Sequence, residues 1–510
     1  MNVDYLRHRT AAARCLILFA CLAAERGEVV KLSQLLENYP QQSADDLDVE
    51  VQGITHDSRY VNPGDVYVCL EGLRVDGHLF AGQAVQRGAA AVVATKPLYL
   101  PVPVVYVADT RHALSYLSDQ FFNHPSRKLH VVGVTGTNGK TTTTHFLQAV
   151  YRAAARPCAV IGTVGIQIDQ EYLPGGLTTP ESFDLHRTFQ EIQERQIQHV
   201  AMEVSSHSLT WKRVEHVEFN TAVFTNLSHD HLDFHHSMEE YFQAKARLFR
   251  LLKPEEDGRP QAIINTDDLY GRQLLSLVDV PVLSYGLQNG ADVQGFIAGS
   301  SVDGTLVVVR YQNLEFELNV HLPGEFNVYN ALAAVAAALA EGISVEAICD
   351  GIDTLETVPG RLEAVNYQQE FSIFIDFAHT PDALEKVLQT LSKVPHRKLI
   401  TLFGCPGDRD RHKRPVMGRI AELYSDVVIV TSDNPASESP EEIIRQILTG
   451  MERLPVVLPD RQEAVRYALS IAEKGDIVLL AGKGHETYQL IGDQHVPYSD
   501  RQAVETFFIQ

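Results

Sequence analysis

Short apolar runs rich in β-branched residues alternate with amphipathic stretches along most of the chain. Apolar runs bounded by turn-forming residues predict strands, whereas apolar residues spaced three and four apart predict helices. Between residues 30 and 109 we expect strands at 49–55, 66–70, 91–94 and 104–107, with one helix near 80–87. This pattern predicts a small α/β domain over residues 30–109.

Two longer blocks continue the alternation. Residues 110–358 contain buried-type strands at 159–162, 200–204 and 222–226, an antiparallel pair at 305–309 and 316–320, and an alanine-rich helix at 329–339. Residues 359–510 contain strands at 373–376, 399–403, 427–431 and 477–481 that alternate with helices. Such alternation predicts mostly parallel sheets covered by helices, the second of them doubly wound. The fold class is therefore α/β.

The segment 1–29 belongs to none of these three blocks. Basic residues at 7–9 precede an apolar run at 15–24, an order that superficially resembles a signal peptide. The run is short and is not followed by a convincing small-residue cleavage site. We interpret 1–29 as a helical extension ahead of the first domain, and an annotated start placed too far upstream is the alternative.

A glycine-rich loop separates a predicted strand from a predicted helix in the run VVGVTGTNGKTTTT, which begins at residue 131. Glycines let backbone N–H groups turn toward phosphate oxygens, and the helix N-terminus adds partial positive charge. Lys140 would reach the terminal phosphates, and the Thr141 hydroxyl would bind Mg²⁺. Gly133 and Gly139 lie one residue further apart than in the usual phosphate loop, so a glycine turn without a ligand is the alternative. The order strand–loop–helix predicts a nucleoside triphosphate site.

Polar clusters follow other predicted strands, where open α/β sheets bind their ligands. Thr178 and Thr179 precede a proline and a helix, and an ordinary helix N-cap is the alternative interpretation. Glu203 ends a strand and offers a carboxylate to Mg²⁺. The run 226–236 is dense in His and Asp but contains no cysteine and matches no common zinc spacing, so metal contacts beside a triphosphate explain it better.

Lys245 lies on one helix face with Tyr241, Leu248 and Leu252, within a helix expected at 238–252. A lysine in an apolar stripe usually extends its amine along the surface to water. The alternative is an inward lysine with a depressed pKa, which can be modified or can bind phosphate.

Eight motifs together resemble the Mur ligases of peptidoglycan synthesis. They are GTNGKTT at 136–142, TTP at 178–180, EVSSH at 203–207, NLSHDHLD at 226–233, GEFNVYN at 324–330, PGRLE at 359–363, DFAHTPD at 376–382 and GKGHE at 482–486. The likeness spans roughly residues 30 to 505. Within the family it is closest in pattern to ligases that add the third residue, a diamino acid, to UDP-N-acetylmuramoyl-L-alanyl-D-glutamate. The resemblance implies three domains: a UDP-binding domain, a central ATPase and a Rossmann-like C-terminal domain.

The resemblance also implies roles at matching positions. The ATP site would comprise Gly136, Thr137, Asn138, Gly139, Lys140, Thr141, Thr142, Asn330, Arg361 and His379. Mg²⁺ would bind Thr141, Glu203, His231 and Lys245, the last as a carbamate formed with CO₂; Lys140, Lys245 and His231 would be catalytic. The UDP-sugar peptide would contact Ser58, Thr178, Thr179, Ser205 and Arg213. The amino acid would contact Arg409, Asp433, Asn434, Gly482 and Glu486.

The implied reaction begins with phosphorylation of a carboxylate by ATP, because oxide is a poor leaving group and phosphate a good one. An amine then attacks the acyl phosphate and gives an amide, ADP and phosphate. Metal ions and Lys140 would neutralise charge on the transferred group. Bringing three substrates together implies domain closure, with a hinge expected near Val358-Pro359-Gly360.

The identity of the added amino acid depends on Asp433-Asn434-Pro435-Ala436. In the family, enzymes that use meso-diaminopimelate carry arginine at the fourth position, where its fork binds the distal carboxylate. Ala436 lacks that group, as do the L-lysine enzymes, so lysine is the first expectation. Meso-diaminopimelate remains the alternative, with a compensating arginine from 408–414, and ornithine is also open.

The net charge of the chain limits the kinds of molecule that it is expected to bind. The chain carries a formal net charge of −22, which argues against a nucleic-acid partner because such binding requires a basic field. Six cysteines form no C-x-x-C pair, as in proteins of a reducing compartment. No run approaches the length needed to span a bilayer. We therefore expect a cytoplasmic monomer without membrane insertion.

Two competing functions remain. Another amide-forming ligase of the superfamily, such as a folylpolyglutamate synthetase, lacks a UDP-binding domain, and Asp57-Ser58-Arg59 argues against it. A P-loop NTPase switch would need no amino-acid site. Phosphate release that requires both UDP-sugar peptide and diamino acid distinguishes a ligase from such a switch.

Overall fold

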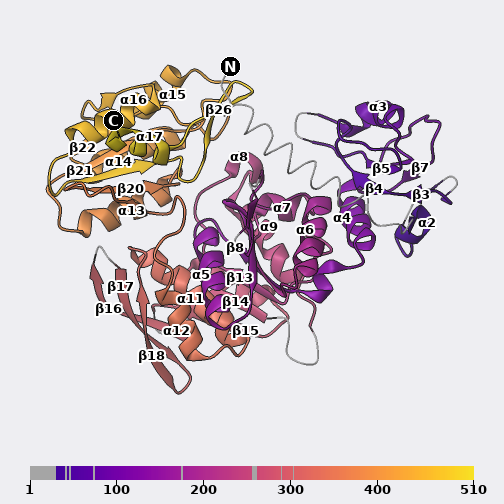
Figure 1. Cartoon of the computed structure of the whole chain (residues 1–510), viewed down its shortest axis with the longest axis horizontal. Coiled ribbons are helices and arrows are strands. Elements are labelled where there is room, and N and C mark those ends of the chain that lie inside the picture. Colours follow the sequence, from indigo (N-terminus) through magenta and orange to yellow (C-terminus); the bar gives the residue numbers. More distant parts are fainter. Residues whose placement is uncertain are drawn as a thin grey trace. The chain divides into compact units, whose positions relative to one another are not determined.

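The structure is a computed structural model that describes residues 30–40, 43–44, 47–72, 75–169, 171–173, 176–254, 261–288, 290–301 and 304–509. The extension expected at 1–29 lies outside these residues. The chain forms two compact units: the first comprises residues up to Val131 with Ile161–Val200 and Val204–Phe219, and the second comprises Val132–Val160, Ala201–Glu203 and the residues from Asn220 onward. Each unit is α/β (Figure 1).

The amino-terminal part of the first unit contains a five-stranded sheet in the order β2-β7-β6-β5-β4. Its strands are β4 (Gly53–Thr55), β5 (Asp65–Val68), β6 (Ala91–Ala94), β7 (Val104–Tyr106) and β2 (Ser43–Ala44). Neighbours pair in parallel except β2 with β7. The segments α2 (Leu32–Leu35), η1 (Gly77–Phe80), α3 (Ala81–Gln86) and α4 (Thr110–Phe121) accompany the sheet. The strand predicted at 49–55 is wrong as one element, because β3 (Glu50–Val51) pairs instead with β1 (Val30–Lys31).

The longest sheet has eleven strands in the order β11-β10-β9-β12-β8-β13-β14-β15-β16-β17-β18. Its strands are β8 (His130–Thr135), β9 (Cys158–Gly162), β10 (Gly165–Ile168), β11 (Glu171–Leu173), β12 (His199–Glu203), β13 (Thr221–Phe224), β14 (Gln261–Asn265), β15 (Val282–Gly286), β16 (Val293–Ser301), β17 (Gly304–Tyr311) and β18 (Leu314–Val320). β13 pairs in parallel with both β8 and β14, so the carboxyl ends of these strands share one edge. The predicted antiparallel pair is confirmed as β17 and β18.

Helices of the central region are α5 (Lys140–Ala153), η2 (Pro125–Lys128), α6 (Ser182–Glu194), α7 (Ser206–Thr210), α8 (Leu232–His235), α9 (Met238–Arg250), α10 (Leu269–Leu274), η3 (Leu275–Leu277), α11 (Glu325–Ala340) and α12 (Val345–Asp353). The alanine-rich α11 lies with α5 and α12 in Figure 1 and is buried over most of its length. Small side chains let α11 pack closely into the core that also contains α5, which carries the glycine-rich loop at its start.

The carboxyl-terminal part contains a six-stranded sheet in the order β19-β20-β24-β21-β22-β23. Its elements are β19 (Glu363–Val365), β20 (Ser372–Asp376), α13 (Pro381–Lys393), β21 (Leu399–Phe403), α14 (Lys413–Tyr424), β22 (Val427–Val430), α15 (Pro440–Leu448), β23 (Val456–Val457), α16 (Arg461–Ile471), β24 (Ile477–Ala481), the hairpin β25 (Tyr488–Ile491) and β26 (Gln494–Pro497), and α17 (Asp500–Ile509). All pairs except β19–β20 are parallel, which confirms the predicted doubly wound pattern. Two separate apolar clusters form the cores of this sheet.

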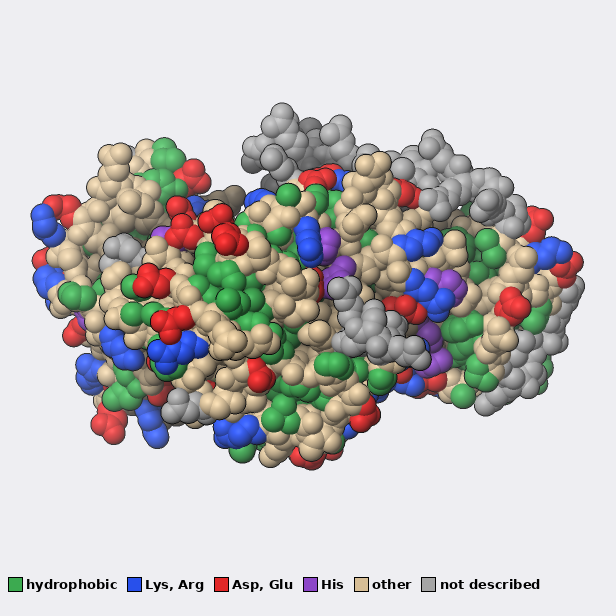
Figure 2. Space-filling model, turned by 90° about the horizontal axis from the view of Figure 1, so that it is seen from below, with side chains coloured by type: hydrophobic (Ala, Val, Ile, Leu, Met, Phe, Trp, Pro, Cys, Tyr) green, Lys and Arg blue, Asp and Glu red, His purple; other side chains and the backbone are tan. Residues whose placement is uncertain are grey.

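Charged side chains are mixed on the face of the molecule shown in Figure 2, where Lys and Arg lie scattered among Asp and Glu. This distribution differs from the continuous basic surface that binds nucleic acid. Among the described residues, no helix is long and apolar enough to cross a membrane.

Candidate functional site

The glycine-rich loop joins β8 to α5, and side chains from other parts of the fold pack against its glycines. Gly136 and Gly139 have φ angles of 151° and 88°, which disfavour side chains. A Cβ at Gly136 would lie 1.9 Å from Oγ1 of Thr225, and one at Gly139 would lie 2.2 Å from Oδ1 of Asn330. Both glycines are therefore required by the packing of this loop as well as by its backbone, and Asn330 lies beside Gly139.

Lys140 begins α5 and turns its amine back over the loop. Its Nζ donates to the carbonyl oxygens of Gly136 and Thr137, each at 2.9 Å. Burial lowers the pKa of Lys140, an effect that the carboxylate of Glu203 opposes. The amine thus lies among backbone groups at a helix N-terminus, where an anion is stabilised.

Thr141 and Glu203 meet beside this lysine. The Thr141 hydroxyl donates to Oε1 of Glu203 at 2.9 Å and accepts from Nη2 of Arg361 at 3.0 Å. Glu203 is buried. A hydroxyl and a carboxylate oxygen at the end of a phosphate loop are the donors that Mg²⁺ prefers, so these residues fit the ion.

Lys245 points inward rather than extending to water. Its side chain is 1% exposed, and its Nζ donates to the carbonyl of Gly136 at 2.7 Å, the same oxygen that Lys140 contacts. Burial holds the pKa of Lys245 well below its usual range, and the charge of Lys140 lowers it further. These effects favour the neutral amine, which is the nucleophilic form.

His231 lies at the start of α8 and is partly exposed. Its Nε2 lies 3.3 Å from Oδ2 of Asp230, and its ring meets that of Tyr241 edge-on. Burial acts to raise the pKa of Asp230, but His231, His379 and Lys413 outweigh it, and the pKa is lowered. Asp230 is therefore a half-buried carboxylate whose charged form is favoured by two histidines and a lysine.

Helix α13 contacts the glycine-rich loop through one carboxylate. Oδ2 of Asp382 accepts from Asn138 Nδ2 at 2.7 Å, Ser228 Oγ at 3.0 Å and Lys386 Nζ at 2.9 Å. Nearby, Lys413 donates to the His379 carbonyl at 2.8 Å, and burial lowers the pKa of His379. The contacts of Asp382 join residues on both sides of the predicted domain boundary and include Asn138 of the implied ATP site.

A second polar cluster lies at the ends of β22 and β24. The fully buried Lys483 amine donates to Oδ1 of Asn434 at 2.8 Å and pairs with Glu486, which also accepts from Asn434 Nδ2 at 3.0 Å. Asp433 is 3% exposed, its Oδ2 has no hydrogen-bond partner, and burial raises its pKa. A Cβ at Gly482 would lie 2.5 Å from that oxygen, so this glycine makes room for the carboxylate.

The position of Ala436 is fixed by backbone contacts. Its N–H donates to the Leu490 carbonyl at 3.0 Å, and its carbonyl accepts from Gly492 at 2.8 Å. Nearby, Arg414 in the first turn of α14 is buried and pairs with Glu438, whereas Arg411, in the loop before that helix, is exposed and lies 3.2 Å from the same carboxylate. Arg409 is exposed, and among the described residues no ion pair is found for it.

The residues implied to bind the UDP-sugar peptide form a network in the first unit. Thr179 Oγ1 accepts from the N–H of Ser205 at 3.1 Å, and the Thr179 carbonyl accepts from Arg213 Nη1 at 3.2 Å. Arg213 also pairs with Glu181 at 2.7 Å. The alternative of a threonine N-cap is wrong, because Glu181 is the N-cap of α6 and Thr178 contacts Thr163 instead.

Ser58 lies apart from that network. Its Oγ donates to Oε1 of Gln83 at 3.1 Å in the amino-terminal sheet domain, and Arg59 pairs with Asp57. The structure records no direct contact of Ser58 with the other predicted substrate residues among those described. It therefore belongs to a separate part of the first unit.

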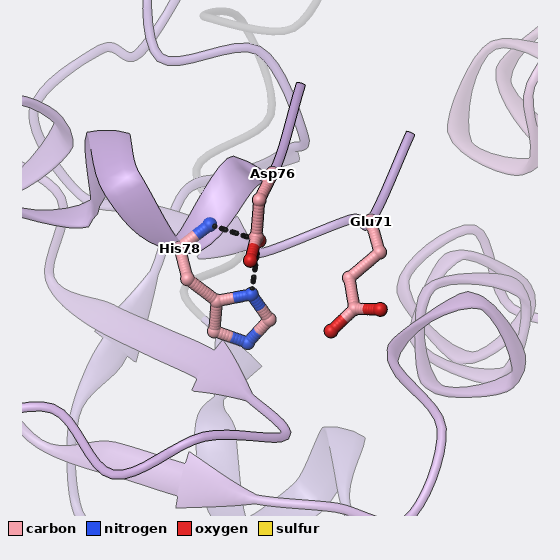
Figure 3. Close-up of side chains that lie close together, drawn as sticks. All are labelled: Glu71, Asp76 and His78. Carbon is pink, nitrogen blue, oxygen red and sulfur yellow. Dashed lines mark hydrogen bonds and ion pairs between the residues drawn. The ribbon is translucent and has the colours of Figure 1, made fainter. Parts of the chain in front are cut away.

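A third group of side chains has the residue types of a metal site, but its possible ligand atoms already form other contacts. Glu71, Asp76 and His78 lie together in Figure 3, where Asp76 accepts from both the backbone and ring nitrogens of His78. The other ring nitrogen accepts from the Thr95 N–H at 3.1 Å, and Lys96 pairs with both carboxylates. Both imidazole nitrogens and the carboxylates are already engaged, so this cluster braces its loop.

Several site residues did not emerge from the sequence alone. Lys483 lies in the GKGHE motif at 482–486 between two residues that were predicted to bind the amino acid, so the motif could have indicated this lysine as well. Asp382 likewise lies in the DFAHTPD motif. The hydroxyl of Tyr241 lies 3.2 Å from Thr137 Oγ1. In the sequence, only its position one helical turn before Lys245 indicated that it belongs to the site.

Three family models match successive parts of the chain. They describe the Mur ligase family catalytic domain at residues 50–122, the Mur ligase middle domain at 134–338 and the Mur ligase glutamate ligase domain at 360–484. These matches agree with the three-domain α/β architecture that the resemblance implied. A P-loop switch, which needs only a nucleotide site, does not account for them.

Similar proteins cover nearly the whole chain. A UDP-N-acetylmuramoyl-L-alanyl-D-glutamate–2,6-diaminopimelate ligase of Syntrophomonas wolfei is 43% identical over 93% of this chain and 98% of its own. A protein of the same name from Geobacillus thermodenitrificans is 44% identical over 89% of this chain and 94% of its own. These relatives are named for diaminopimelate and do not support the predicted preference for lysine.

Solved structures of ligases are also similar to this chain. A structure of the same named ligase matches with a TM-score of 0.67 at 31% identity, covering 94% of this chain and 99% of that one. Folylpolyglutamate synthase of Mycobacterium tuberculosis, at 18% identity and a TM-score of 0.61 over 79% of this chain and 95% of its own, shares the fold alone. The chain belongs to the Mur ligase family and is an ATP-dependent acid–amino-acid ligase.

Proposed function

We propose that this ligase joins 2,6-diaminopimelate, in its meso form, to UDP-N-acetylmuramoyl-L-alanyl-D-glutamate in peptidoglycan synthesis. The observation that carries the proposal is 43% identity over 93% of the chain to a protein named for that reaction. The motif content of all three domains supports it. ATP phosphorylates the glutamate carboxylate, the amine attacks the acyl carbon, and phosphate departs with formation of the amide bond.

The glycine-rich loop is proposed to hold the triphosphate of ATP. Its backbone N–H groups and the Lys140 amine would contact the phosphates along Gly136, Thr137, Asn138, Gly139, Thr141 and Thr142. Asn330, Arg361 and His379 would complete the site, and Arg361 already contacts Thr141. The Lys140 amine, released from its carbonyl contacts, would stabilise charge on the transferred phosphoryl group.

Mg²⁺ is proposed to bind Thr141, Glu203, His231 and a carbamate on Lys245. The ion would neutralise charge on the phosphates. The neutral Lys245 amine would attack CO₂, lose a proton to water and become an anion. This change would place an anion, in place of a neutral amine, beside the Lys140 cation, and the two opposite charges attract.

The carboxyl-terminal cluster is proposed to bind the amino acid. Asp433, Asn434, Gly482 and Glu486 would contact one ammonium and carboxylate end, and Arg409 would pair with a carboxylate. Ala436 leaves the second carboxylate of diaminopimelate without the usual arginine. Arg411 is the candidate replacement, since its side chain is exposed and its one recorded contact with Glu438 is longer, at 3.2 Å, whereas the buried Arg414 forms two hydrogen bonds of 2.9 Å with that carboxylate.

Ligation rates with meso-diaminopimelate, its LL isomer, lysine and ornithine test this assignment. We expect kcat/KM for meso-diaminopimelate to exceed that for lysine at least about tenfold, because lysine lacks the second carboxylate and forgoes a charge-assisted contact with Arg411 that is worth about 1.4 kcal/mol or more. Arg411→Met should lower diaminopimelate use and leave lysine use unchanged. A wild-type preference for lysine would overturn the amino-acid assignment and return Ala436 to its first interpretation.

Three further expectations stay predictions. They are the domain boundaries at residues 30–109, 110–358 and 359–510, a monomeric state, and a cytoplasmic location, where ATP and the nucleotide-sugar peptide are available. Ser58, Thr178, Thr179, Ser205 and Arg213 are proposed to bind that peptide. Analytical ultracentrifugation and limited proteolysis test the state and the boundaries.

A further inference from the structure

Two arginines lie against the single tryptophan of the chain. Trp211 follows α7, and the guanidinium carbons of Arg111 and Arg213 each lie 4.9 Å from the centroid of its ring. Arg111 comes from the first turn of α4, far from the other two residues in sequence. Cation–aromatic contacts of this kind orient both the ring and the cations.

The cations of this cluster outnumber its carboxylates. Lys212 pairs with Asp109 at 2.7 Å, and Arg213 pairs with Glu181 at 2.7 Å. Arg111 Nη1 lies 4.0 Å from the same Glu181 oxygen and has no hydrogen-bond partner, while Nη2 donates to a backbone carbonyl at 3.0 Å. Arg111 therefore shares the Glu181 carboxylate with Arg213 and, among the described residues, has no hydrogen-bonded carboxylate of its own.

Burial makes that excess charge costly. Nη1 of Arg111 is shielded from solvent, and burial lowers the pKa of the guanidinium. A desolvated cation without a hydrogen-bonded anion destabilises a fold unless a ligand compensates it. Such residues are retained where binding requires them, which makes Arg111 a candidate for a functional role.

Direct contacts connect this cluster to the residues proposed to bind the nucleotide-sugar peptide. Arg213 Nη1 donates to the Thr179 carbonyl at 3.2 Å, and Thr179 in turn contacts Ser205. A substrate oxyanion at these residues would experience the positive field of Arg111. It would also lie beside the indole ring that Arg111 holds.

We propose that Arg111 is a positioning residue for an oxyanion of the nucleotide-sugar peptide and that it acts through Trp211 and Arg213. The inference rests on the proposed function, because that function supplies the anionic substrate. The group recognised is a carboxylate or a phosphate. Arg111 holds the indole ring and keeps Arg213 oriented, so that the substrate meets a preformed site.

Arg111→Met tests the proposal, because it removes the charge and keeps the length of the side chain. Arg187→Met is the matched control: Arg187 also pairs with an acid, Asp184 at 2.7 Å, and lies 5.8 Å from the Phe183 ring, but the contacts recorded for it among the described residues include no proposed substrate residue. Arg111→Lys, which retains the charge, serves if the methionine variant does not fold.

The expected result is a KM for UDP-N-acetylmuramoyl-L-alanyl-D-glutamate that rises at least about tenfold in Arg111→Met, with KM for ATP and for diaminopimelate within about twofold of wild type. Arg111→Lys should recover part of the loss, and Arg187→Met should match wild type. Because Trp211 is the only tryptophan, its fluorescence measures binding without turnover. The dissociation constant from that titration should rise by the same factor.

Three titrants distinguish the oxyanion. Weaker binding of UDP by Arg111→Met would identify the diphosphate, whereas weakening only with the D-glutamate-containing peptide, and not with UDP-N-acetylmuramoyl-L-alanine, would identify the glutamate carboxylate. Unchanged binding, or equal rises in all three KM values, would overturn the inference. A wild-type protein that neither binds nor ligates the nucleotide-sugar peptide would instead remove the proposed function.

Discussion

The glycine-rich loop and the carboxyl-terminal polar cluster both contain buried lysines, but they balance charge in opposite ways. Lys140 and Lys245 donate to backbone carbonyls, and among the described residues no carboxylate lies within ion-pair distance of either amine. Lys483 instead bonds to the side chains of Asn434 and Glu486. The loop therefore holds an excess of positive charge suited to a triphosphate, whereas the cluster is internally balanced and suited to an amino-acid zwitterion.

The largest effect should follow from removing charge at the loop. Lys140→Met should lower kcat by at least about 10²–10³-fold, because it removes a charge that stabilises the transferred phosphoryl group. Lys474→Met, at an exposed lysine paired with Glu370, is the control and should be near wild type. The measurement is phosphate release coupled to ligation. A folded Lys140→Met enzyme with normal turnover would remove the distinction between the two regions.

Lys245 tests whether the loop also acquires an anion. Lys245→Ala should lower turnover by about 10²-fold, the scale of one electrostatic group in a catalytic site, and formate or acetate should restore part of it. Wild-type activity should fall when CO₂ is removed and return with bicarbonate. If neither short acids nor bicarbonate changes the rates, Lys245 acts as a cation and the carbamate proposal is wrong.

Removal of the balanced lysine should have a smaller and more selective effect. Lys483→Met leaves Glu486 and Asn434 without their shared donor, so KM for the amino acid should rise about tenfold, the cost of one charge-assisted contact. KM for ATP should change by less than about twofold. Steady-state kinetics with each substrate varied in turn gives both values. An equal rise in the two constants would show that Lys483 supports the whole domain rather than its pocket.

His186 is a third kind of buried base: its Nδ1 lies 3.7 Å from Oδ1 of Asp119, and among the described residues its ring forms no hydrogen bond. It is fully buried, both ring nitrogens lack hydrogen bonds, and burial, with smaller contributions from His216 and His124, lowers its pKa to about 3. A histidine whose pKa is lower in the folded than in the unfolded protein makes its full contribution to the free energy of unfolding above about pH 6.5. That contribution is lost as the pH falls toward 3. Between pH 7 and 5 the loss is about 2 kcal/mol of unfolding free energy.

Urea unfolding followed by Trp211 fluorescence, which reports on the unit that contains His186, measures this loss. His186→Leu should lose about 2 kcal/mol less than wild type between those pH values. Equal pH dependence in the two proteins would show that His186 is already protonated or solvated in the fold.

Local features were predicted well, and features that depend on distant contacts were not. The strands at 91–94, 399–403 and 477–481 coincide with β6, β21 and β24, because short, nearly continuous apolar runs suit fully buried strands. β14 and β15 were missed, although both lie in the parallel part of the long sheet. The lysine preference rested on the single position Ala436, and the alternative, a compensating arginine from 408–414, depends on which side chains of that loop are already paired in the fold.

The amino-acid sequence by itself determined the glycine-rich loop, because φ angles and the order of strand, glycine and helix are local properties. It also determined the family, since many ordered motifs are compared one residue at a time. Only the tertiary structure decided that Lys245 shares a carbonyl with Lys140, that Asp382 contacts the loop across 244 residues and that Arg111 lies against Trp211. Those contacts join distant segments, and their energies depend on burial and charge that no single segment contains.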